Sequence, residues 1–483
     1  MVGHVPLSSA CSPCNRNTGE MITFSDSSPY SRRSFLRVGG LGLGGLTLPQ
    51  LLGWKAAAAQ AGLPVKDKAV VFLFMHGGPP QQETFDPKMD APSEIRSATG
   101  EVKTTLPGVT FGGTFQKLAK QAHRMAVVRS YTTGNGNHDI KPIVGKDTLN
   151  ANMGALYARV AGANVPSTGM PRNVALFPRA VDPAAQERVK NFGNFLASGT
   201  VGSGYAPFAP GSGKNGLQND MTMWMSRRRL EDRMYLLNKI DNLKRAVDGG
   251  AADGLGKLQQ QAVEMIMGGI SDAFDLSKED PRTLARYDTA PLVNPNSISK
   301  LWNNHKNYRD HGQSLGKLML MARRLCERGA GFVTVTTNFV WDFHSDKNNA
   351  GVAEGMAYVG APFDHAVSAF LDDVHERGLS DKILLVCCGE MGRTPKLAAN
   401  GGRNHWGRLA PLMLSGGGLK MGQVIGESTS DAGEPASNAV TTENLIGTIM
   451  HTLLDLGDVR VMESLPRDVH NIITSANPIP ELV

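Results

Sequence analysis

Three side chains that can bind metals, anions or protons follow one apolar stretch late in the chain. Glu390 and Arg393 come shortly after residues 381–388, and His405 comes twelve positions after Arg393. A short apolar run without alternation is typical of a central parallel strand, and the Gly and Thr-Pro residues behind it interrupt regular structure. Sites in open α/β sheets form at the carboxyl ends of the strands. We therefore expect a carboxylate, a guanidinium and an imidazole at one edge of a sheet.

Acidic residues also follow two other apolar runs, residues 68–76 and residues 331–339. Carboxylates and imidazoles without thiolates suit Zn²⁺, Mn²⁺, Mg²⁺ or Ca²⁺. Each such residue can instead be satisfied within its own turn or ion pair, but their shared position at strand ends favours a site. The predicted ligands of a divalent metal are Asp342, His344, Glu390, His405, Glu83 and Asp86.

These residue types fit the transfer of a phosphoryl or sulfuryl group. Two divalent ions about 4 Å apart would hold the attacking and leaving oxygens. Arg393 would bind the tetrahedral anion through two hydrogen bonds. The nucleophile would be a metal-activated water or a hydroxyl, with Ser130, at the end of the strand at residues 125–130, and Thr133, just after it, as candidates. A purely structural turn explains these two hydroxyls equally well.

Strands alternate with helices along the chain, which predicts an α/β fold with a doubly wound, mainly parallel sheet. Residues 150–220 are rich in Gly, Pro, Ala and Asn and show weak periodicity, and residues 199–300 are expected to form a loop and a helical insertion. The predicted strands cover residues 68–76, 125–130, 331–339, 381–388 and 411–418, and the predicted helices cover 115–122, 221–247, 255–274, 311–328, 362–377 and a segment beginning at 441.

The first 61 residues have the pattern of an export signal. Residues 31–37 read Ser-Arg-Arg-Ser-Phe-Leu-Arg, which is close to the twin-arginine pattern, and a glycine-rich apolar stretch and a run of alanines follow. The apolar stretch is too short and too rich in glycine to span a membrane. We expect a leader at residues 1–61, one α/β domain at residues 62–483, a periplasmic or secreted protein, and no stable transmembrane span after processing.

Charge and cysteine content argue against a nucleic-acid-binding protein and against a disulfide-stabilised fold. The 483-residue chain has a formal charge of +6, which falls to +3 when residues 1–61 are left out, and no long basic run argues for nucleic acid. Five cysteines, of which Cys387 and Cys388 are adjacent, do not form a disulfide framework.

Several motifs resemble an exported family of unknown function, with twin-arginine signals, that is often labelled sulfatase-like and belongs to the alkaline phosphatase superfamily. The matching segments are Gly77-Gly78-Pro79, Thr84-Phe85-Asp86-Pro87-Lys88, Trp341-Asp342-Phe343-His344, residues 389–395, Arg403-Asn404-His405-Trp406, and Gly416-Gly417-Gly418 with Gly426-Glu427. The resemblance implies an alkaline phosphatase or sulfatase type of sheet with a metal-bearing edge. It places ligands at Asp342, His344, Glu390 and His405.

The chain departs from that pattern after Gly77-Gly78-Pro79. Gln81 stands where the family usually has a histidine, and Glu83 stands where it has an aspartate. Two functions are therefore open. The first is an exported metal-dependent hydrolase of phosphate or sulfate esters, acting on a small molecule or a polysaccharide. The second is a catalytically inactive family member that acts as a secreted binding or structural protein.

Overall fold

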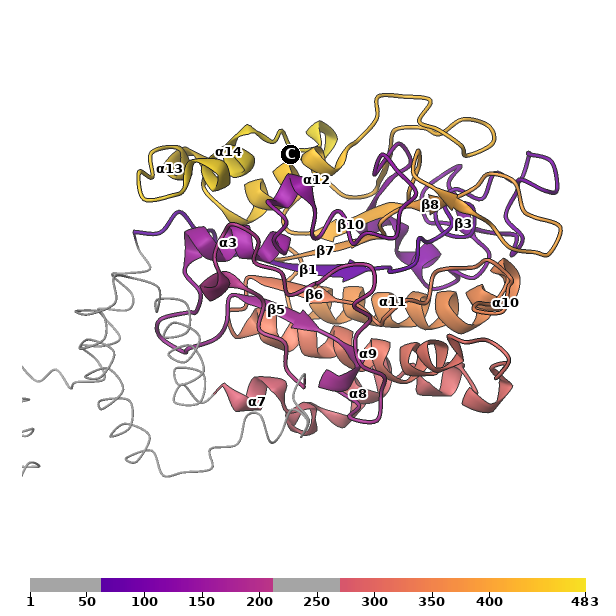
Figure 1. The fold of residues 1–483 in the computed structure, drawn as a ribbon, viewed down its shortest axis with the longest axis horizontal. Helices are drawn as coiled ribbons and strands as arrows, with labels where there is room; N and C mark the ends of the chain where they lie inside the picture. The colour runs from indigo at the N-terminus through magenta and orange to yellow at the C-terminus, as the bar shows by residue number, and fades with distance from the viewer. Residues whose placement is uncertain (1–61, 212–269) are drawn as a thin grey trace, which may run out of the picture. The chain divides into compact units, whose positions relative to one another are not determined.

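The computed structural model describes residues 62–211 and 270–483. A seven-stranded sheet runs through this part of the chain in the order β11-β4-β10-β7-β1-β6-β5 (Figure 1). Within this sheet, only the pairs that involve β10 are antiparallel. The mainly parallel α/β sheet expected from the sequence is confirmed. Its strands are β1 (Ala69–Phe74), β4 (Ala126–Val128), β5 (Asn173–Leu176), β6 (Phe332–Val335), β7 (Ile383–Cys388), β10 (Leu412–Gly416) and β11 (Gln423–Ile425).

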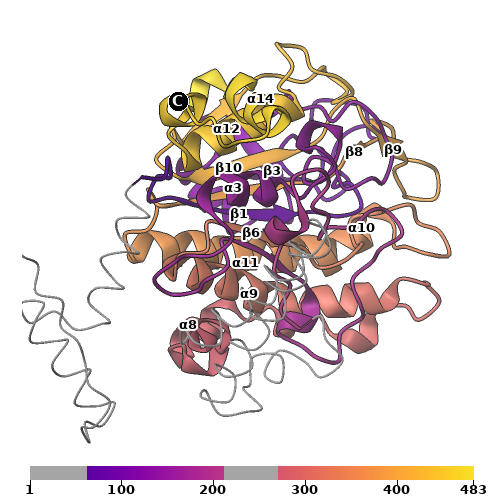
Figure 2. The ribbon, with the colours of Figure 1, turned by 60° about the vertical axis from the view of Figure 1, so that its left-hand side comes forward.

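Helices cover both faces of the sheet, so the fold is doubly wound. Figures 1 and 2 show α9 and α11 along one face and α3, α12 and α14 along the other. The described helices are α3 (Met153–Ala161), α7 (Ser271–Phe274), α8 (Pro281–Tyr287), α9 (His305–Glu327), α10 (Val352–Gly355), α11 (Ala361–Glu376), α12 (Thr442–Leu453), α13 (Leu456–Arg460) and α14 (Arg467–Ser475). Two small ribbons, β2 (Glu101–Lys103) with β3 (Thr110–Gly112) and β8 (Gly392–Arg393) with β9 (His405–Trp406), lie outside the main sheet.

The central strands are apolar throughout because each face packs against helices. All six residues of β1 and all six of β7 are buried. Val71 and Leu73 belong to the core that includes α9 and α11, whereas Val70 and Phe72 belong to the core that includes α3 and α12. Alternate side chains of a strand point to opposite faces, so a doubly covered strand shows no polar alternation.

Sequence and structure differ in the weakly periodic parts of the chain. The predicted helix at residues 115–122 is a 3-10 helix at Leu118–Arg124. The stretch at residues 150–220 contains α3 and the edge strand β5, whose four residues are too few to produce a clear pattern. The predicted helix at residues 221–247, and residues 255–269 of the next one, lie outside the described residues.

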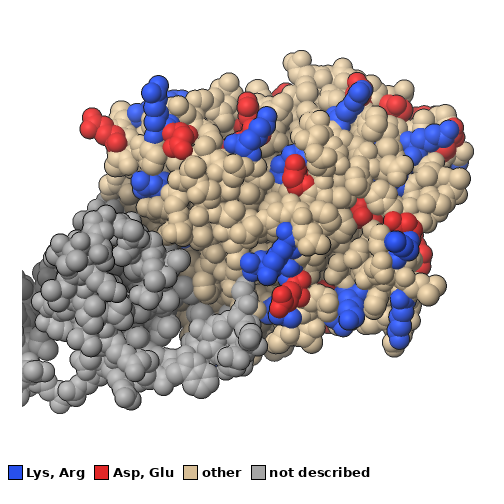
Figure 3. Space-filling view, in the orientation of Figure 1, with Lys and Arg blue, Asp and Glu red and all other residues tan. Residues whose placement is uncertain are grey.

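The described part of the chain contains no helix that is long and apolar enough to cross a membrane. Its three cysteines, Cys326, Cys387 and Cys388, are free thiols. On the face drawn in Figure 3, basic and acidic side chains are interspersed.

The segments that follow β1, β4, β6 and β7 leave the sheet at one edge, since these four strands run in the same direction.

Candidate metal centre

The segment after β6 is held tightly against the segment after β1. The carbonyl oxygen of His76 accepts hydrogen bonds from the backbone N–H groups of Val340 (3.1 Å) and Trp341 (3.0 Å). A Cβ atom on Gly77, whose φ is +118°, would lie 2.7 Å from the backbone nitrogens of Trp341 and Asp342. Only glycine fits both this conformation and this contact. The Gly-Gly turn therefore serves to place Asp342 at the carboxyl edge.

The hairpin of β8 and β9 brings residues 389–395 and residues 403–406 together, because Arg393 pairs with His405 in its register. The loop after β4 lies beside this hairpin. The backbone N–H of Gly134 and the hydroxyl of Thr132 both donate to the carbonyl of Gly407, at 3.0 and 3.1 Å. This anchoring places His138, on the same loop, next to His405.

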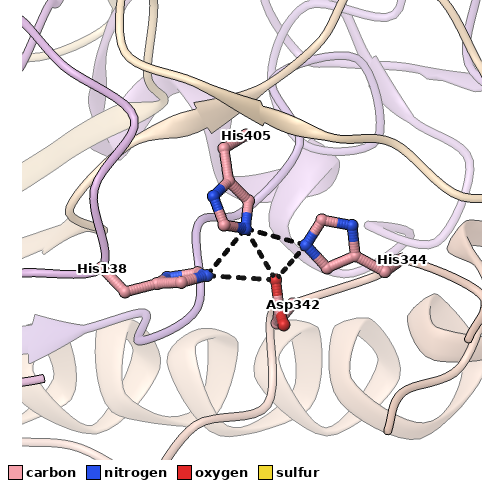
Figure 4. Close-up of side chains that lie close together, drawn as sticks. All are labelled: His138, Asp342, His344 and His405. Atoms are coloured by element: carbon pink, nitrogen blue, oxygen red, sulfur yellow. Dashed lines mark hydrogen bonds and ion pairs between the residues drawn. The ribbon is translucent and has the colours of Figure 1, made fainter. Parts of the chain in front are cut away.

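Three imidazoles surround one carboxylate oxygen at this edge (Figure 4). The Oδ1 atom of Asp342 lies 3.3 Å from Nε2 of His138, 3.0 Å from Nε2 of His344 and 3.6 Å from Nε2 of His405. Nε2 of His405 lies 2.9 Å from Nε2 of His138 and 2.8 Å from Nε2 of His344. The four ligand atoms thus converge on one point.

These separations fit four ligands of one metal ion. A tetrahedral ion with bonds of 2.0–2.1 Å to nitrogen and oxygen has ligands about 3.3 Å apart. Five of the six separations range from 2.8 to 3.6 Å, and all four atoms lie within 4.8 Å of one another. A shared proton can join two imidazole nitrogens, but one cation satisfies all four atoms. In the part of the chain that the structure describes, this is the one group of His, Cys, Asp or Glu with such geometry.

The neighbours of the cluster orient its ligand atoms. Nδ1 of His138 lies 2.9 Å from Oε1 of Glu390, and both oxygens of Glu390 accept from the backbone N–H of Gly77. A hydrogen bond from Nδ1–H to a carboxylate leaves Nε2 free to bind a metal. Oδ2 of Asp342 accepts from the side chain of Asn349 at 2.8 Å, which leaves Oδ1 for the cluster. Glu390, predicted as a direct ligand, contacts Nδ1 of His138, whereas the cluster contains Nε2 of that ring.

Electrostatics at the cluster favour a cation. Burial alone would raise the pKa of Asp342, but hydrogen bonds from the three histidines and the charge of Arg393 hold that pKa well below its ordinary value. Burial would lower the pKa of His138, but the carboxylates of Asp342 and Glu390 raise it. The cluster therefore combines an ionised carboxylate with one imidazole, that of His138, whose pKa is raised.

Arg393 is fully buried and its guanidinium is bonded to protein groups. Nε donates to the carbonyl of Gly78 at 2.9 Å and Nη1 donates to the carbonyl of Arg403 at 3.1 Å, while Nη2 contacts Asp342 and the carbonyl of Gly77. The structure therefore presents Arg393 as a counter-charge to Asp342. It does not present the guanidinium as an open anion-binding fork.

The structure places Glu83 and Asp86 away from the cluster. Both oxygens of Glu83 accept hydrogen bonds from the segment Ser97–Thr99, at 2.7–3.1 Å, and Arg403 lies 3.6 Å away. Asp86 contacts Ser428 and lies within 3.5 Å of Lys88 and Arg129. Each carboxylate is surrounded by donors from the protein, so neither offers a free oxygen to an ion.

The two hydroxyls predicted as nucleophiles occupy other surroundings. Ser130 is fully buried, and a Cβ atom on Gly426 would lie 2.2 Å from its Oγ. Thr133 lines a separate cavity of about 570 Å³ together with Asp139 and Phe192. Neither residue belongs to the four-residue cluster.

The sequence patterns did not identify His138 as a member of this cluster. This residue follows the same strand as Ser130 and Thr133, but a loop of glycines and asparagines separates it from the strand end. Its position at the end of a parallel strand was the signal that could have identified it. Its ring packs against Phe339 and Phe192, with centroids 4.6 and 5.1 Å apart.

A family model described as "Protein of unknown function (DUF1501)" matches residues 67–471. The chain belongs to this family. The match includes the four clustered residues, so the candidate centre lies within the DUF1501 region. No curated protein matches the chain.

Among solved structures, the DUF1501 chain is similar to the PsFucS1 sulfatase from Pseudoalteromonas sp., with 13% identity, a TM-score of 0.34, and coverage of 89% of this chain and 74% of that one. It is also similar to the phosphonate monoester hydrolase SpPMH from Silicibacter pomeroyi, with 12% identity, a TM-score of 0.25, and coverage of 85% and 78%. The phosphonate monoester hydrolase of Agrobacterium radiobacter gives 10% identity, a TM-score of 0.24 and the same coverage. These similarities assign no activity to the chain.

Proposed function

We propose that His138, Asp342, His344 and His405 bind one divalent metal ion. The observation that carries this proposal is the convergence of three Nε2 atoms and one carboxylate oxygen, all within 4.8 Å of one another. Three nitrogens and one oxygen favour a transition ion such as Zn²⁺ over Mg²⁺ or Ca²⁺, which prefer oxygen ligands.

We further propose that the protein is an exported, metal-dependent hydrolase of phosphate or sulfate esters within the alkaline phosphatase superfamily. When bound, the ion supplies a Lewis acid for an oxygen of the ester. His405 and His344 form the open side, since their side chains are 36% and 21% exposed while that of Asp342 is 8% exposed. A substrate would approach from that side.

The residues around the ligands have supporting roles in this proposal. Glu390 keeps the proton of His138 on Nδ1, so that Nε2 faces the ion. Arg393 compensates the charge of Asp342 and holds the segments after β1 and β7 together. Phe339 and Phe192 shield His138 from water. The nucleophile would come from water, because Ser130 and Thr133 lie outside the cluster.

The test is an activity assay on metal-free protein that has been reloaded with Zn²⁺ or Mn²⁺. We expect hydrolysis of 4-nitrophenyl phosphate or 4-nitrophenyl sulfate that depends on the ion and is lost in a His344→Ala/His405→Ala double variant. A His375→Ala variant is the matched control, since His375 is exposed on α11. Fully loaded protein that hydrolyses neither ester would contradict the hydrolase proposal.

A second function, a secreted binding or structural protein without catalysis, is favoured by the surroundings of Gln81. Its side-chain nitrogen donates to the carbonyls of Arg393 (2.7 Å) and Ala432 (2.9 Å), and its oxygen accepts from the backbone N–H of Arg393. Gln81 thus joins loops at the position where the family resemblance implies a histidine. Metal binding without ester hydrolysis would support this second function.

A further inference from the structure

A second unusual charge lies at the opposite edge of the sheet. Arg172 directly precedes β5, at the amino end of the strand, and it is only 3% exposed. Its carbonyl accepts from the backbone N–H groups of Gly331 (3.1 Å) and Phe332 (2.8 Å), so its backbone position is fixed by the start of β6.

The guanidinium of Arg172 lacks the partners that a buried cation needs. Nη1 is 3.4 Å from the hydroxyl of Tyr157, while Nε and Nη2 are buried without hydrogen-bond partners. In the described part of the chain, no carboxylate forms an ion pair with it. An arginine stays protonated under all ordinary conditions, and burying an unpaired ion costs free energy. Two strong donors are therefore left without an acceptor from the protein.

Arg172 lines a cavity of about 510 Å³ that carries further positive charge. Lys66 and Lys68 also line it, and their ammonium groups contact backbone carbonyls of His451 and Asp381. The remaining charged residues of the lining are compensated by ion pairs. Asp67 pairs with Lys382, and Glu327 pairs with Arg323 and Arg377. The cavity is thus left with an excess of cations and has the size of a small-molecule site.

We propose that this cavity binds an oxyanion of the phosphate or sulfate class, with the guanidinium of Arg172 as its main ligand. The planar guanidinium matches two oxygens of such an anion. Lys66 and Lys68, which also line the cavity, add to the favourable potential. The site lies at the amino edge of the sheet, whereas the metal cluster lies at the carboxyl edge, so the two sites are independent.

The test compares anion binding by the wild-type protein and an Arg172→Met variant. Calorimetric titration with inorganic sulfate, inorganic phosphate and glucose 6-phosphate should show saturable binding of at least one probe by the wild type. Affinity should fall at least tenfold in the variant. Arg159→Met is the matched control, because Arg159 also bonds a tyrosine hydroxyl, that of Tyr205, but is only half-buried. Its affinity should match that of the wild type.

Two further arms separate this site from the metal centre and from a failure to fold. The His344→Ala/His405→Ala variant should bind the probe as the wild type does. Arg172→Met should melt at or above the wild-type temperature in a buffer without oxyanions, because replacing an unpaired buried charge by an apolar side chain is often stabilising. Selenate soaked into crystals of the wild type should give an anomalous peak next to the guanidinium. Binding that is unaffected by Arg172→Met, or the absence of that peak, would overturn the proposal.

Discussion

Two groups of acidic residues follow strands β1 and β6, and only one of them faces imidazoles. Asp342 has three Nε2 atoms around one oxygen. Glu83 is fully buried, and its oxygens accept hydrogen bonds from Ser97, Ala98 and Thr99. A carboxylate whose lone pairs are taken by N–H and O–H donors of a loop holds that loop, whereas one that faces several imidazole nitrogens can share a cation with them. The partners, rather than the position after a strand, decide between these roles.

The largest expected effect comes from removing two partly exposed ligands. A His344→Ala/His405→Ala double variant should lose all bound metal, since two of four ligands are removed and the remaining two cannot hold an ion in competition with water. Its fold should persist because both side chains are partly exposed. Metal analysis checks the loss and circular dichroism checks the fold. The single variant His375→Ala should retain the metal.

The opposite result, lower stability with unchanged metal content, is expected for Glu83, which holds the segment Ser97–Thr99. Glu83→Ala should lower the free energy of unfolding by about 3–5 kcal/mol, because the donors of Ser97–Thr99 would be left without acceptors and the buried charge of Arg403 would lose its carboxylate. Urea denaturation measures this change, and Glu101→Ala, at an exposed position in β2, is the control. The metal content of folded Glu83→Ala should equal that of the wild type. A loss of metal in this variant would break the distinction between the two groups.

A smaller effect on metal binding is expected at Glu390, which contacts Nδ1 of His138. Glu390→Gln should weaken metal affinity about 10–100-fold, as is common when the hydrogen-bond partner of a ligating histidine is altered. Competition with a fluorescent chelator gives the affinity. If Glu390 were a direct ligand instead, its substitution would remove metal as completely as substitution of the histidines does.

The smallest effect concerns pH and a third buried acid, Asp364, which accepts from the backbone N–H groups of Lys117 and Leu118. Burial raises its pKa from 3.8 to about 6, against these hydrogen bonds. Because the folded state favours the proton, its contribution to stability is present below about pH 4 and is lost as pH rises through about 6. Asp364→Asn should therefore be more stable than the wild type at neutral pH, by about 1–3 kcal/mol, and this advantage should shrink toward about pH 4. An advantage that is independent of pH would contradict this.

Long apolar runs made the sheet predictable. β1 and β7 are buried on both faces, so their sequences alone indicated central strands and the edge at which Asp342, His344 and His405 meet. β5 and α3 were missed because they are short and lie in a segment rich in Gly, Pro and Ala.

Side-chain partners were not predictable in the same way. The sequence does not reveal that residues 97–99 occupy the lone pairs of Glu83, or that three backbone carbonyls occupy the guanidinium of Arg393. The sequence also does not show that the loop after β4, anchored to Gly407 through Thr132, brings His138 next to His405. These contacts join segments that are far apart along the chain, and they decide which polar residues remain available.

The most direct test of the central proposal is elemental analysis of the purified protein, prepared without chelators or metal-affinity resin and then incubated with Zn²⁺ or Mn²⁺ and desalted. One equivalent of a transition metal per chain, absent from the His344→Ala/His405→Ala variant, is the predicted result. A folded wild-type protein that stays metal-free after incubation, or that holds the same metal content as the double variant, would contradict it.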